Sequence, residues 1–344
     1  MKQIVQTGAR SVEVQESDQP KPGPDEVLVR VHSAGICGSD AHAYKYDGGY
    51  DWIQIPRVMG HEYSGRVEEV GSNVTTFGPG DKVVEEPIHH CGECLQCKRG
   101  EENVCENFSI TGMHRDGAYA DYVTVGHEHL HAVPDSVSLQ EAAITEPTSI
   151  ATRAVLTQSD LTPGDDVLVE GPGPIGVLTA VIADSVGANV IASGLSHDVQ
   201  SRFPTLKRLG IDTIDIETNS LENAVAERTD GVGFDVVFDA TGHHSGIKTA
   251  TENVRKGGQV VIVGIPNEPS DVLLSPVVRG EVDINSSYGS KWADFEKALQ
   301  LMENDTIDAE AIIDTSFSRD DPKSAFEAFL DSQVIKPVFT FSEE

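Results

Sequence analysis

The sequence predicts an α/β protein in which a β-rich part is combined with a doubly wound parallel sheet. Two observations lead to this prediction. Up to about residue 150 the chain holds short strand-like segments interrupted by glycine and proline, and beyond it strand-like and helix-like segments alternate. With 344 residues, the chain has the length of about two ordinary domains.

The individual elements follow from the apolar pattern. The β-rich part is predicted to hold strands at residues 27–32, 65–70 and 82–84, and its proline-rich segment 19–25 is predicted to be a turn. The middle of the chain predicts strands at 166–170, 188–192, 234–238 and 259–263, with a helix at 177–186. The last part predicts a helix at 292–303 and a strand at 334–341.

The charge of the chain is strongly negative. It has 25 basic and 56 acidic residues, a formal charge of −31, and the acids are spread along the whole sequence. Such a surface repels nucleic acids and anionic membranes, so neither is expected as a partner. The low number of lysines, 12, favours an adaptation to high salt over an acidic protein of an ordinary environment, because salt screens the self-repulsion.

The sequence also predicts a cytoplasmic location. No apolar run approaches the roughly 20 residues that a membrane helix needs. The N-terminus has no apolar signal segment, so a reducing compartment is expected.

Four of the five cysteines, Cys91, Cys94, Cys97 and Cys105, lie within fifteen residues. In a reducing compartment such a cluster binds a metal more often than it forms disulfides. Four thiolates around a tetrahedral ion leave no open position, so the cluster favours structural zinc, with an iron–sulfur cluster as the alternative.

The fifth cysteine, Cys37, is followed along the chain by His61-Glu62 and by Glu146. Cysteine, histidine and carboxylate are the ligand types of catalytic zinc, which keeps one position for water or substrate. A lone cysteine is more often a small core residue, and sequence spacing does not show that these residues converge.

A glycine motif, Gly171-Pro-Gly173-Pro-Ile-Gly176, lies between the predicted strand 166–170 and the predicted helix 177–186. Within a strand–helix–strand unit this motif indicates a Rossmann dinucleotide-binding domain. The first glycine permits the tight turn, the second lets the backbone approach the pyrophosphate, and the third lets helix and strand pack closely. The helix N-terminus then holds the diphosphate.

The next predicted strand runs into Ser193-Gly194 without the acidic residue that NAD enzymes place on the ribose hydroxyls, and the first carboxylate beyond it is Asp198. The missing acid removes a charge that would repel a 2′-phosphate, so the sequence favours NADP over NAD. The alternative is an NAD enzyme that contacts the ribose differently. The candidate cofactor-binding residues are Gly171, Gly173, Pro174, Ile175, Gly176, Ser193, Gly194, Ser196, His197, Arg202, Thr241, Gly264 and Ile265.

Together these motifs resemble the zinc-containing medium-chain alcohol dehydrogenases, close to the sorbitol (polyol) and threonine dehydrogenases, over essentially the full length. The resemblance implies a GroES-like β-rich catalytic domain at residues 1–150, completed by 286–344, and a Rossmann domain at 151–285. It also implies a homo-oligomer, either a dimer or a tetramer. The motifs that carry it are, in order, Cys37-Gly-Ser39-Asp40-x-His42, Gly60-His61-Glu62, the four cysteines, Glu146-Pro147 and the glycine motif.

The resemblance further implies two zinc ions per chain, one catalytic and one structural in the four cysteines. Cys37, His61 and Glu62 would bind the catalytic ion, and Glu146 would bind it directly or through water. His61 and Glu62 would point to opposite faces of a regular strand, so both can bind only if the backbone bends there.

A proton pathway is implied in the same way. Asp40 would orient His61. Ser39 would accept the proton of the zinc-bound alcohol, and the nicotinamide ribose would relay it to His42 and solvent, while a hydride moves to the nicotinamide.

The implied substrate is a polyol, a sugar or a secondary alcohol. Candidate residues of its pocket are Tyr44, Tyr50, Trp52 and Arg115. The segment 284–292 lacks the arginine of typical sorbitol dehydrogenases, which argues against sorbitol itself. An L-threonine 3-dehydrogenase-like activity or an aldose (glucose-type) dehydrogenase activity is an alternative. A non-catalytic nucleotide-binding protein on the same fold is another. The loss of zinc ligands would indicate such a protein, and none of the ligand residues is missing from the sequence.

Overall fold

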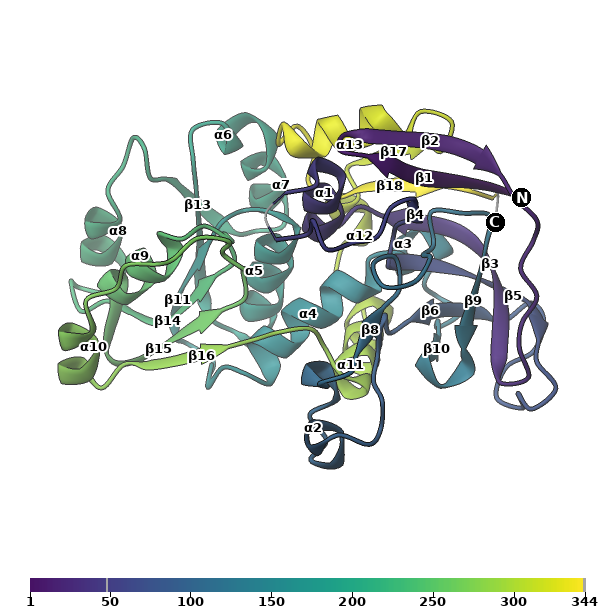
Figure 1. The fold of residues 1–344 in the computed structure, drawn as a ribbon. Helices are drawn as coiled ribbons and strands as arrows, with labels where there is room; N and C mark the ends of the chain where they lie inside the picture. Colours follow the sequence, from purple (N-terminus) through teal and green to yellow (C-terminus); the bar gives the residue numbers. More distant parts are fainter. Residues whose placement is uncertain (48, 343–344) are drawn as a thin grey trace. The chain divides into compact units, whose positions relative to one another are not determined.

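The computed structural model describes residues 1–47 and 49–342, and the chain forms two compact units (Figure 1). The first unit comprises Met1–Ser149, Gly289–Glu303 and the described residues from Ile313 onward. The second comprises Ile150–Tyr288 and Asn304–Ile312. The segment Asn304–Ile312, which the sequence placed with the β-rich part, joins the second unit because its helix α12 (Ala309–Ile312) contacts α7 (Phe203–Arg208).

The first unit is built around a sheet of seven strands whose centre is β3 (Glu26–Gly35). Nearly every residue of β3 is buried, which explains its almost continuous apolar sequence. The strand order is β10 (Leu130–Ala132), β6 (Lys82–Glu85), β5 (Glu62–Val70), β3, β18 (Pro337–Thr340) and β17 (Thr315–Ser318), and β9 (Tyr122–Gly126) also pairs with β3.

Smaller elements complete the first unit. They are the three-stranded sheet of β2 (Ser11–Glu16), β1 (Lys2–Gly8) and β4 (Arg57–Val58), and the pair β7 (Ile88–His89) and β8 (Ser109–Ile110). The helices are α1 (Gly38–Lys45), α2 (Leu95–Lys98), α3 (Leu139–Ala142), α4 (Thr145–Leu156, which runs on into the second unit), α11 (Trp292–Glu303) and α13 (Pro322–Leu330), with 3₁₀ turns Glu102–Val104 and His127–His129.

The second unit is a six-stranded parallel sheet with helices between its strands, which confirms the predicted Rossmann architecture. Its order is β13 (Asp212–Asp215), β12 (Asn189–Gly194), β11 (Asp166–Glu170), β14 (Phe234–Asp239), β15 (Val254–Ile262) and β16 (Asp283–Ser286). Its further helices are α5 (Pro174–Val186), α6 (Asp198–Ser201), α8 (Leu221–Arg228), α9 (Gly246–Asn253) and α10 (Leu274–Gly280).

The order of these strands places a switch point between β11 and β14. Sequence neighbours proceed outward from β11 on one side and from β14 on the other, so the connections diverge there. Ligands of such sheets bind outside the carboxyl ends of the strands at this point. One face of the sheet packs Leu168 and Val237 against Ile247 and Ala250 of α9.

Predicted and observed elements agree closely where the apolar pattern is strong. The strand Asp166–Glu170 and the helix Trp292–Glu303 match residue for residue, and segment 19–25 is irregular and ends in a turn at Pro24–Asp25. The strand predicted at 334–341 is shorter, Pro337–Thr340, because the backbone N–H groups of Ile335 and Lys336 donate to the carboxylate of Asp314 and not to a neighbouring strand. None of the described helices is long and apolar enough to cross a membrane.

Candidate metal centres and dinucleotide site

Three predicted ligands of the catalytic zinc converge in the first unit. One ligand atom from each of Cys37, His61 and Glu62 lies within 4.8 Å of the others. Cys37 is the N-cap of α1, directly after β3, whereas His61 and Glu62 lie at the start of β5. Gly60 has a φ of 93°, so the backbone turns just before His61, and both side chains can reach one site.

Asp40 lies beside His61, as the sequence predicted. Its Oδ1 is 3.6 Å from Nδ1 of His61, and neither of these buried atoms has a hydrogen-bond partner. Its Oδ2 accepts hydrogen bonds from the backbone N–H of Cys37 (3.1 Å) and from the hydroxyl of Tyr119 (2.8 Å). Burial alone would lower the pKa of His61, but the neighbouring Asp40 and Cys37 raise it well above its usual value.

A residue that the sequence did not single out, Lys336, binds Glu62. Its Nζ donates to both carboxylate oxygens, at 2.8 and 2.6 Å, and to the carbonyl of Ile36 at 3.0 Å. Lys336 and Glu62 are both 1% exposed. Glu62 is therefore in contact with a buried ammonium and also belongs to the close group with Cys37 and His61.

Glu146 lies in the first turn of α4 and is close enough for its charge to interact with His61, Glu62 and Lys336. Burial raises the pKa of Glu146 to about 7, and the nearby His61 opposes this shift. Glu146 does not belong to the close group of three ligand atoms in the described chain. A thiolate, an imidazole and carboxylates form a donor set that fits zinc.

Ser39 and His42 follow Cys37 on α1, three residues apart and therefore on one face of the helix. The imidazole of His42 is partly exposed; its Nδ1 lies 3.2 Å from Oδ1 of Asp47 and its ring stacks on Tyr50 with centroids 5.7 Å apart. These contacts give His42 a route towards solvent.

Of the predicted residues of the substrate pocket, Tyr44 is buried and Trp52 is exposed. Tyr44 is fully buried, donates a hydrogen bond to Glu327 and stacks on Phe326, so its prediction as a pocket residue is wrong. It points inward because it lies on the face of α1 that packs against α13. Trp52 is 47% exposed and its ring lies 4.6 Å from that of His114.

Arg115 is bound within the first unit. It donates to Nδ1 of His89 and to the carbonyl of Thr124. His89 in turn contacts the buried Glu85, so the arginine belongs to a polar network of the sheet.

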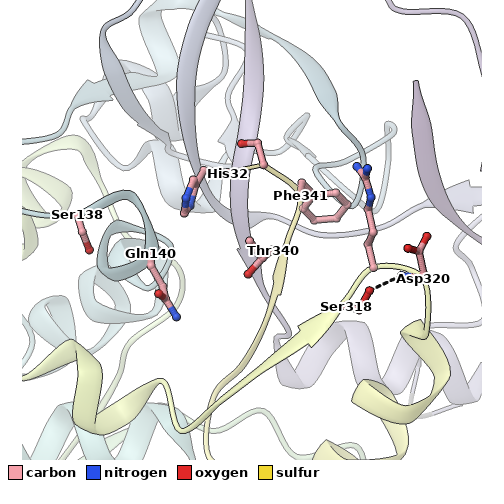
Figure 2. A pocket seen from close by; sticks show the side chains of 9 residues that line it. His32, Ser138, Gln140, Ser318, Asp320, Thr340 and Phe341 are labelled. Carbon is pink, nitrogen blue, oxygen red and sulfur yellow. Dashed lines mark hydrogen bonds between the residues drawn. The ribbon is translucent and has the colours of Figure 1, made fainter. Parts of the chain in front are cut away.

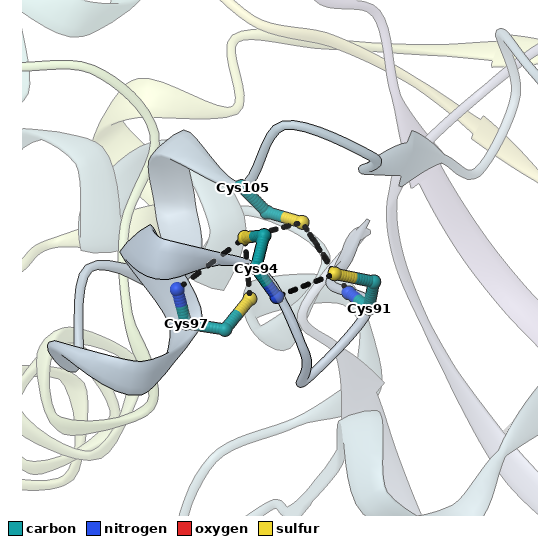
Figure 3. Close-up of side chains that lie close together, drawn as sticks. All are labelled: Cys91, Cys94, Cys97 and Cys105. Carbon is teal, nitrogen blue, oxygen red and sulfur yellow. Dashed lines mark hydrogen bonds between the residues drawn. The ribbon is translucent and has the colours of Figure 1, made fainter.

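The four-cysteine cluster is a compact lobe around α2 (Figure 3). The Sγ atoms of Cys94 and Cys97 are 3.4 Å apart, those of Cys94 and Cys105 are 3.7 Å apart, and those of Cys91 and Cys105 are 3.5 Å apart. All four lie within 4.8 Å of one another and none forms a disulfide. Tetrahedral zinc with bonds of about 2.3 Å requires sulfurs about 3.8 Å apart, so the lobe fits one ion and is too small for the iron–sulfur alternative.

The thiols of this lobe differ in acidity. Backbone N–H groups of Glu93 and Cys94 lower the pKa of Cys91 to about 6. Desolvation and the neighbouring sulfurs Cys94 and Cys105 raise the pKa of Cys97 to about 12. A bound cation would stabilise the thiolate of Cys97, whose pKa is raised, and this is the chemistry of a structural metal site.

The glycine motif begins directly after β11 at the switch point of the second unit. A Cβ on Gly176 would lie 1.8 Å from the carbonyl oxygen of Gly171, so only glycine lets α5 approach this turn. Gly173 caps α5, and the space where its side chain would point is open. These are the features that allow a diphosphate to lie against the N-terminus of α5.

The other predicted cofactor residues lie at the carboxyl ends of neighbouring strands. Ser193 and Gly194 end β12, Thr241 follows β14, and Gly264 and Ile265 follow β15. Ser193 is 3% exposed, whereas Ile265 is 56% exposed. Thr241 donates both its N–H and its hydroxyl to Asp239, which fixes the turn after β14.

Three of the candidate cofactor residues that follow β12 already contact carboxylates. Ser196 donates to Asp215 and Glu217, and both Arg202 and His197 contact Asp198. Asp215 and Glu217 were missed because they lie on and after β13, outside the segment where the sequence motif places the ribose acid. The parallel register that pairs Gly194 with Asp215 would have indicated them.

A cavity of about 560 Å³ lies elsewhere in the first unit (Figure 2). His32, Gln140, Arg319 and Phe341 are among its lining residues. None of the candidate metal or cofactor residues lines this cavity, so the cavity is separate from the candidate metal centres and the dinucleotide site.

Comparisons with known proteins agree with this architecture. Residues 23–135 match the alcohol dehydrogenase GroES-like domain and residues 174–304 match the zinc-binding dehydrogenase family. A sorbitol dehydrogenase of Halalkalibacterium halodurans is 35% identical over 99% of each chain. An NADP-bound zinc-binding dehydrogenase of Sinorhizobium meliloti 1021 superposes with a TM-score of 0.90, at 27% identity over 98% of each chain. The 2R,3R-butanediol dehydrogenase of Bacillus subtilis superposes with a TM-score of 0.89, at 29% identity over 98% of this chain and 99% of that chain.

The chain therefore belongs to the zinc-binding medium-chain dehydrogenases of the alcohol dehydrogenase type. It is an NAD(P)-dependent oxidoreductase of the branch that includes sorbitol and threonine dehydrogenases.

We expect Lys336→Met to lower the free energy of unfolding by about 3–5 kcal/mol, because it leaves the carboxylate of Glu62 buried without its partner. Thermal and denaturant unfolding measure this loss. The double variant Lys336→Met/Glu62→Gln should recover most of it. Lys248→Met, which removes an exposed lysine paired with Glu252, should cost less than about 1 kcal/mol; an equally small loss for Lys336→Met would contradict the assignment.

A second prediction concerns Glu86, which is 6% exposed and lies after β6. Burial, followed by the charges of Glu102 and Asp294, raises the pKa of Glu86 to about 8. The folded protein therefore holds a proton that the unfolded chain releases near its usual pKa, so the stabilisation is complete at low pH and is lost as pH rises through about 8.

We expect Glu86→Gln to flatten the fall in unfolding free energy between about pH 5 and pH 8, and to gain roughly 2–4 kcal/mol relative to the wild type at the upper end. Unfolding measured at a series of pH values tests this. Glu69→Gln, at an exposed position of β5, serves as the control and should leave the slope unchanged.

Proposed function

We propose that this chain oxidises a polyol, a sugar or a secondary alcohol at a zinc bound by Cys37, His61 and Glu62, with NAD(P) as hydride acceptor. The observation that carries this proposal is the convergence of these three side chains, from two separate segments, within 4.8 Å. The relatives named sorbitol dehydrogenase and 2R,3R-butanediol dehydrogenase support an alcohol with neighbouring hydroxyls as substrate.

Zinc bound at this site would lower the pKa of an alcohol and the nicotinamide would accept the hydride. We propose that Cys37, His61 and Glu62 hold the metal and that Glu146 approaches it directly or through water. Lys336 neutralises Glu62 when that carboxylate is not on the metal. Asp40, anchored by Tyr119, keeps the imidazole of His61 in place.

We propose that two side chains of α1, Ser39 and His42, remove the proton of the alcohol. Ser39 accepts the proton of the alcohol, and His42 passes it to solvent, because His42 lies on the same helix face and is partly exposed.

A second candidate is an L-threonine 3-dehydrogenase activity, since a protein of that name from Anaeromyxobacter sp. (strain K) is 33% identical over 90% of this chain. An aldose dehydrogenase is a further alternative. A non-catalytic nucleotide-binding protein is disfavoured because Cys37, His61 and Glu62 lie close enough together to hold a metal.

The preference for NADP over NAD stays a prediction. It is supported by the absence of an acid at Gly194 and by the NADP complex of the Sinorhizobium meliloti relative. The binding of Ser196 to two carboxylates opposes it.

We also propose a homo-oligomer, a dimer or tetramer, that uses the outer edge of the parallel sheet. Strand β16 ends the sheet of the described chain, and all four of its residues are exposed. Three apolar side chains nearby, Leu273, Leu274 and Val278, are 60–73% exposed. Such an unpaired edge beside an apolar patch fits association with a second copy.

The remaining proposals rest on composition. A cytoplasmic location agrees with five free cysteines. The charge of −31 supports function in high salt and argues against nucleic acids and anionic membranes as partners. The small-molecule alcohol is then the partner that matters.

Metal analysis combined with turnover tests the proposed function. We expect two zinc ions per chain, and reduction of NAD⁺ or NADP⁺ by at least one member of a panel of polyols, sugars, secondary alcohols and threonine. Cys37→Ser should keep one zinc and lose turnover, whereas Cys94→Ser should lose the other zinc and lower stability more than turnover. One zinc per wild-type chain without hydride transfer would refute the catalytic site.

The proton pathway has its own test. Ser39→Ala should lower kcat by about 10²–10⁴-fold with little change in zinc content. His42→Ala should lower kcat less, and added imidazole should partly restore it. Unchanged kcat in Ser39→Ala would exclude that hydroxyl from proton transfer.

A further inference from the structure

The end of β12 is held to the end of β13 by a small acidic cluster. In the parallel register Gly194 lies opposite Asp215. Ser196 donates its hydroxyl to Oδ2 of Asp215 at 2.9 Å and its backbone N–H to Oε2 of Glu217 at 2.8 Å. Asp215 also accepts the N–H of Glu217 at 3.0 Å and the hydroxyl of Thr218 at 3.0 Å, so its position is fixed.

The glycine at the end of β12 has a local steric cause. A Cβ on Gly194 would lie 2.8 Å from carbon atoms of both Phe203 and Pro172, and 2.9 Å from Oδ2 of Asp198. No acidic side chain fits at this position without displacing these neighbours. The absence of the usual ribose acid is therefore a packing constraint and does not by itself indicate a phosphate site.

The groups that could bind a 2′-phosphate are already paired with carboxylates. Nη1 of Arg202 lies 3.3 Å from Oδ1 of Asp198, and Nε2 of His197 lies 3.4 Å from the same oxygen. Both hydrogen-bond donors of Ser196 point to Asp215 and Glu217. A phosphate at this edge would have to displace carboxylates from the donors it needs and then lie against their charge.

The two acids are also suited to a different ligand. Desolvation opposes ionisation of Asp215, but hydrogen bonds from Glu217, Ser196 and Thr218 hold its pKa below the usual value. An ionised carboxylate at the carboxyl end of the sheet accepts hydrogen bonds from the 2′- and 3′-hydroxyls of an unphosphorylated ribose, which is the task of the missing acid. Glu217 is exposed and can accept such bonds directly.

We propose that Asp215 and Glu217 are specificity-determining residues that select the ribose 2′-hydroxyl over a 2′-phosphate, and so take over from β13 the task that other dinucleotide-binding sheets give to the end of the second strand. The proposal rests on the proposed NAD(P)-dependent function. It opposes the preference predicted from Gly194 alone, so the wild-type protein should bind NAD⁺ at least as tightly as NADP⁺.

Equilibrium binding to the full-length, zinc-loaded protein tests the proposal without relying on turnover. Titration calorimetry would compare NAD⁺ with NADP⁺, and 5′-AMP with adenosine 2′,5′-bisphosphate, for the wild type, Glu217→Gln and the double variant Asp215→Asn/Glu217→Gln. We expect the double variant to bind NADP⁺ and the bisphosphate at least about tenfold more tightly than the wild type, and NAD⁺ and AMP two- to threefold more weakly. Glu217→Gln should give a smaller change in the same direction.

A matched control removes the same charge elsewhere in the second unit. Glu222→Gln/Glu227→Gln neutralises two exposed acids of α8 and should leave the ratio of NADP⁺ to NAD⁺ affinity within about twofold of the wild type. The gain in the double variant should shrink as salt is raised, since it arises from charge at an exposed site.

The outcomes separate the two proposals. An unchanged ratio in Asp215→Asn/Glu217→Gln, with melting temperature preserved, overturns the role of these acids and leaves the dehydrogenase function standing. An equal shift in the α8 control shows a general charge effect and also overturns it. A wild-type protein that binds neither dinucleotide refutes the proposed function itself, and this inference with it.

Discussion

The buried ion pair between Lys336 and Glu62 is the interaction on which the metal site depends. An ammonium group taken out of water must be paired and hydrogen-bonded, and Lys336 finds its partners in Glu62 and in the carbonyl of Ile36. These residues come from the start of β5 and the end of β3, and the lysine itself directly precedes β18. Satisfying this one charge brings together three segments distant in sequence, and Cys37 and His61 are the immediate neighbours of two of its partners.

This pairing also explains how a carboxylate can be a candidate metal ligand in a buried site. Without a metal, Lys336 is the buried cation that pairs with the carboxylate of Glu62. With a metal, the same oxygens can turn to the ion while the ammonium retains the carbonyl of Ile36. Burial raises the pKa of the neighbouring Glu146 to about 7, and the charges of His61 and Lys336 oppose this shift. The two carboxylates of this site thus differ in their surroundings, because Lys336 donates hydrogen bonds to both oxygens of Glu62.

In the second unit, too, the carboxylates find their hydrogen-bond partners through the tertiary structure. Asp198, Asp215 and Glu217 bind the donors around the end of β12, so a region that looks free of acid in sequence is acidic in space. Close packing at Gly194 leaves no room for an acidic side chain at the end of β12. Asp215 lies on the neighbouring strand β13, and the parallel pairing places it opposite Gly194 at the same edge of the sheet. The carboxyl ends of parallel strands allow this arrangement because they lie side by side.

The sequence predicted most of what local pattern controls. Apolar runs bounded by glycine gave strand Asp166–Glu170 and the Rossmann order, and cysteine spacing gave the tetrahedral lobe. The sequence-based predictions were wrong where a residue's contacts depend on a partner distant in the chain. Tyr44 packs against Phe326 of α13 and not into a pocket. Strand β18 begins at Pro337, after Lys336, and is shorter than predicted. Neither partner is visible from the residues next to it in the chain.

By itself, the sequence determined the two-part architecture, the ligand types of both metal centres and the dinucleotide turn, because each follows from residue type and short spacing. Only the tertiary structure decided that Cys37, His61 and Glu62 meet, that Lys336 neutralises Glu62, and that Asp215 and Glu217 occupy the donors of Ser196. The physical reason is that buried charge is compensated by whatever opposite charge or donor the fold brings within about 3 Å, whatever its distance along the chain.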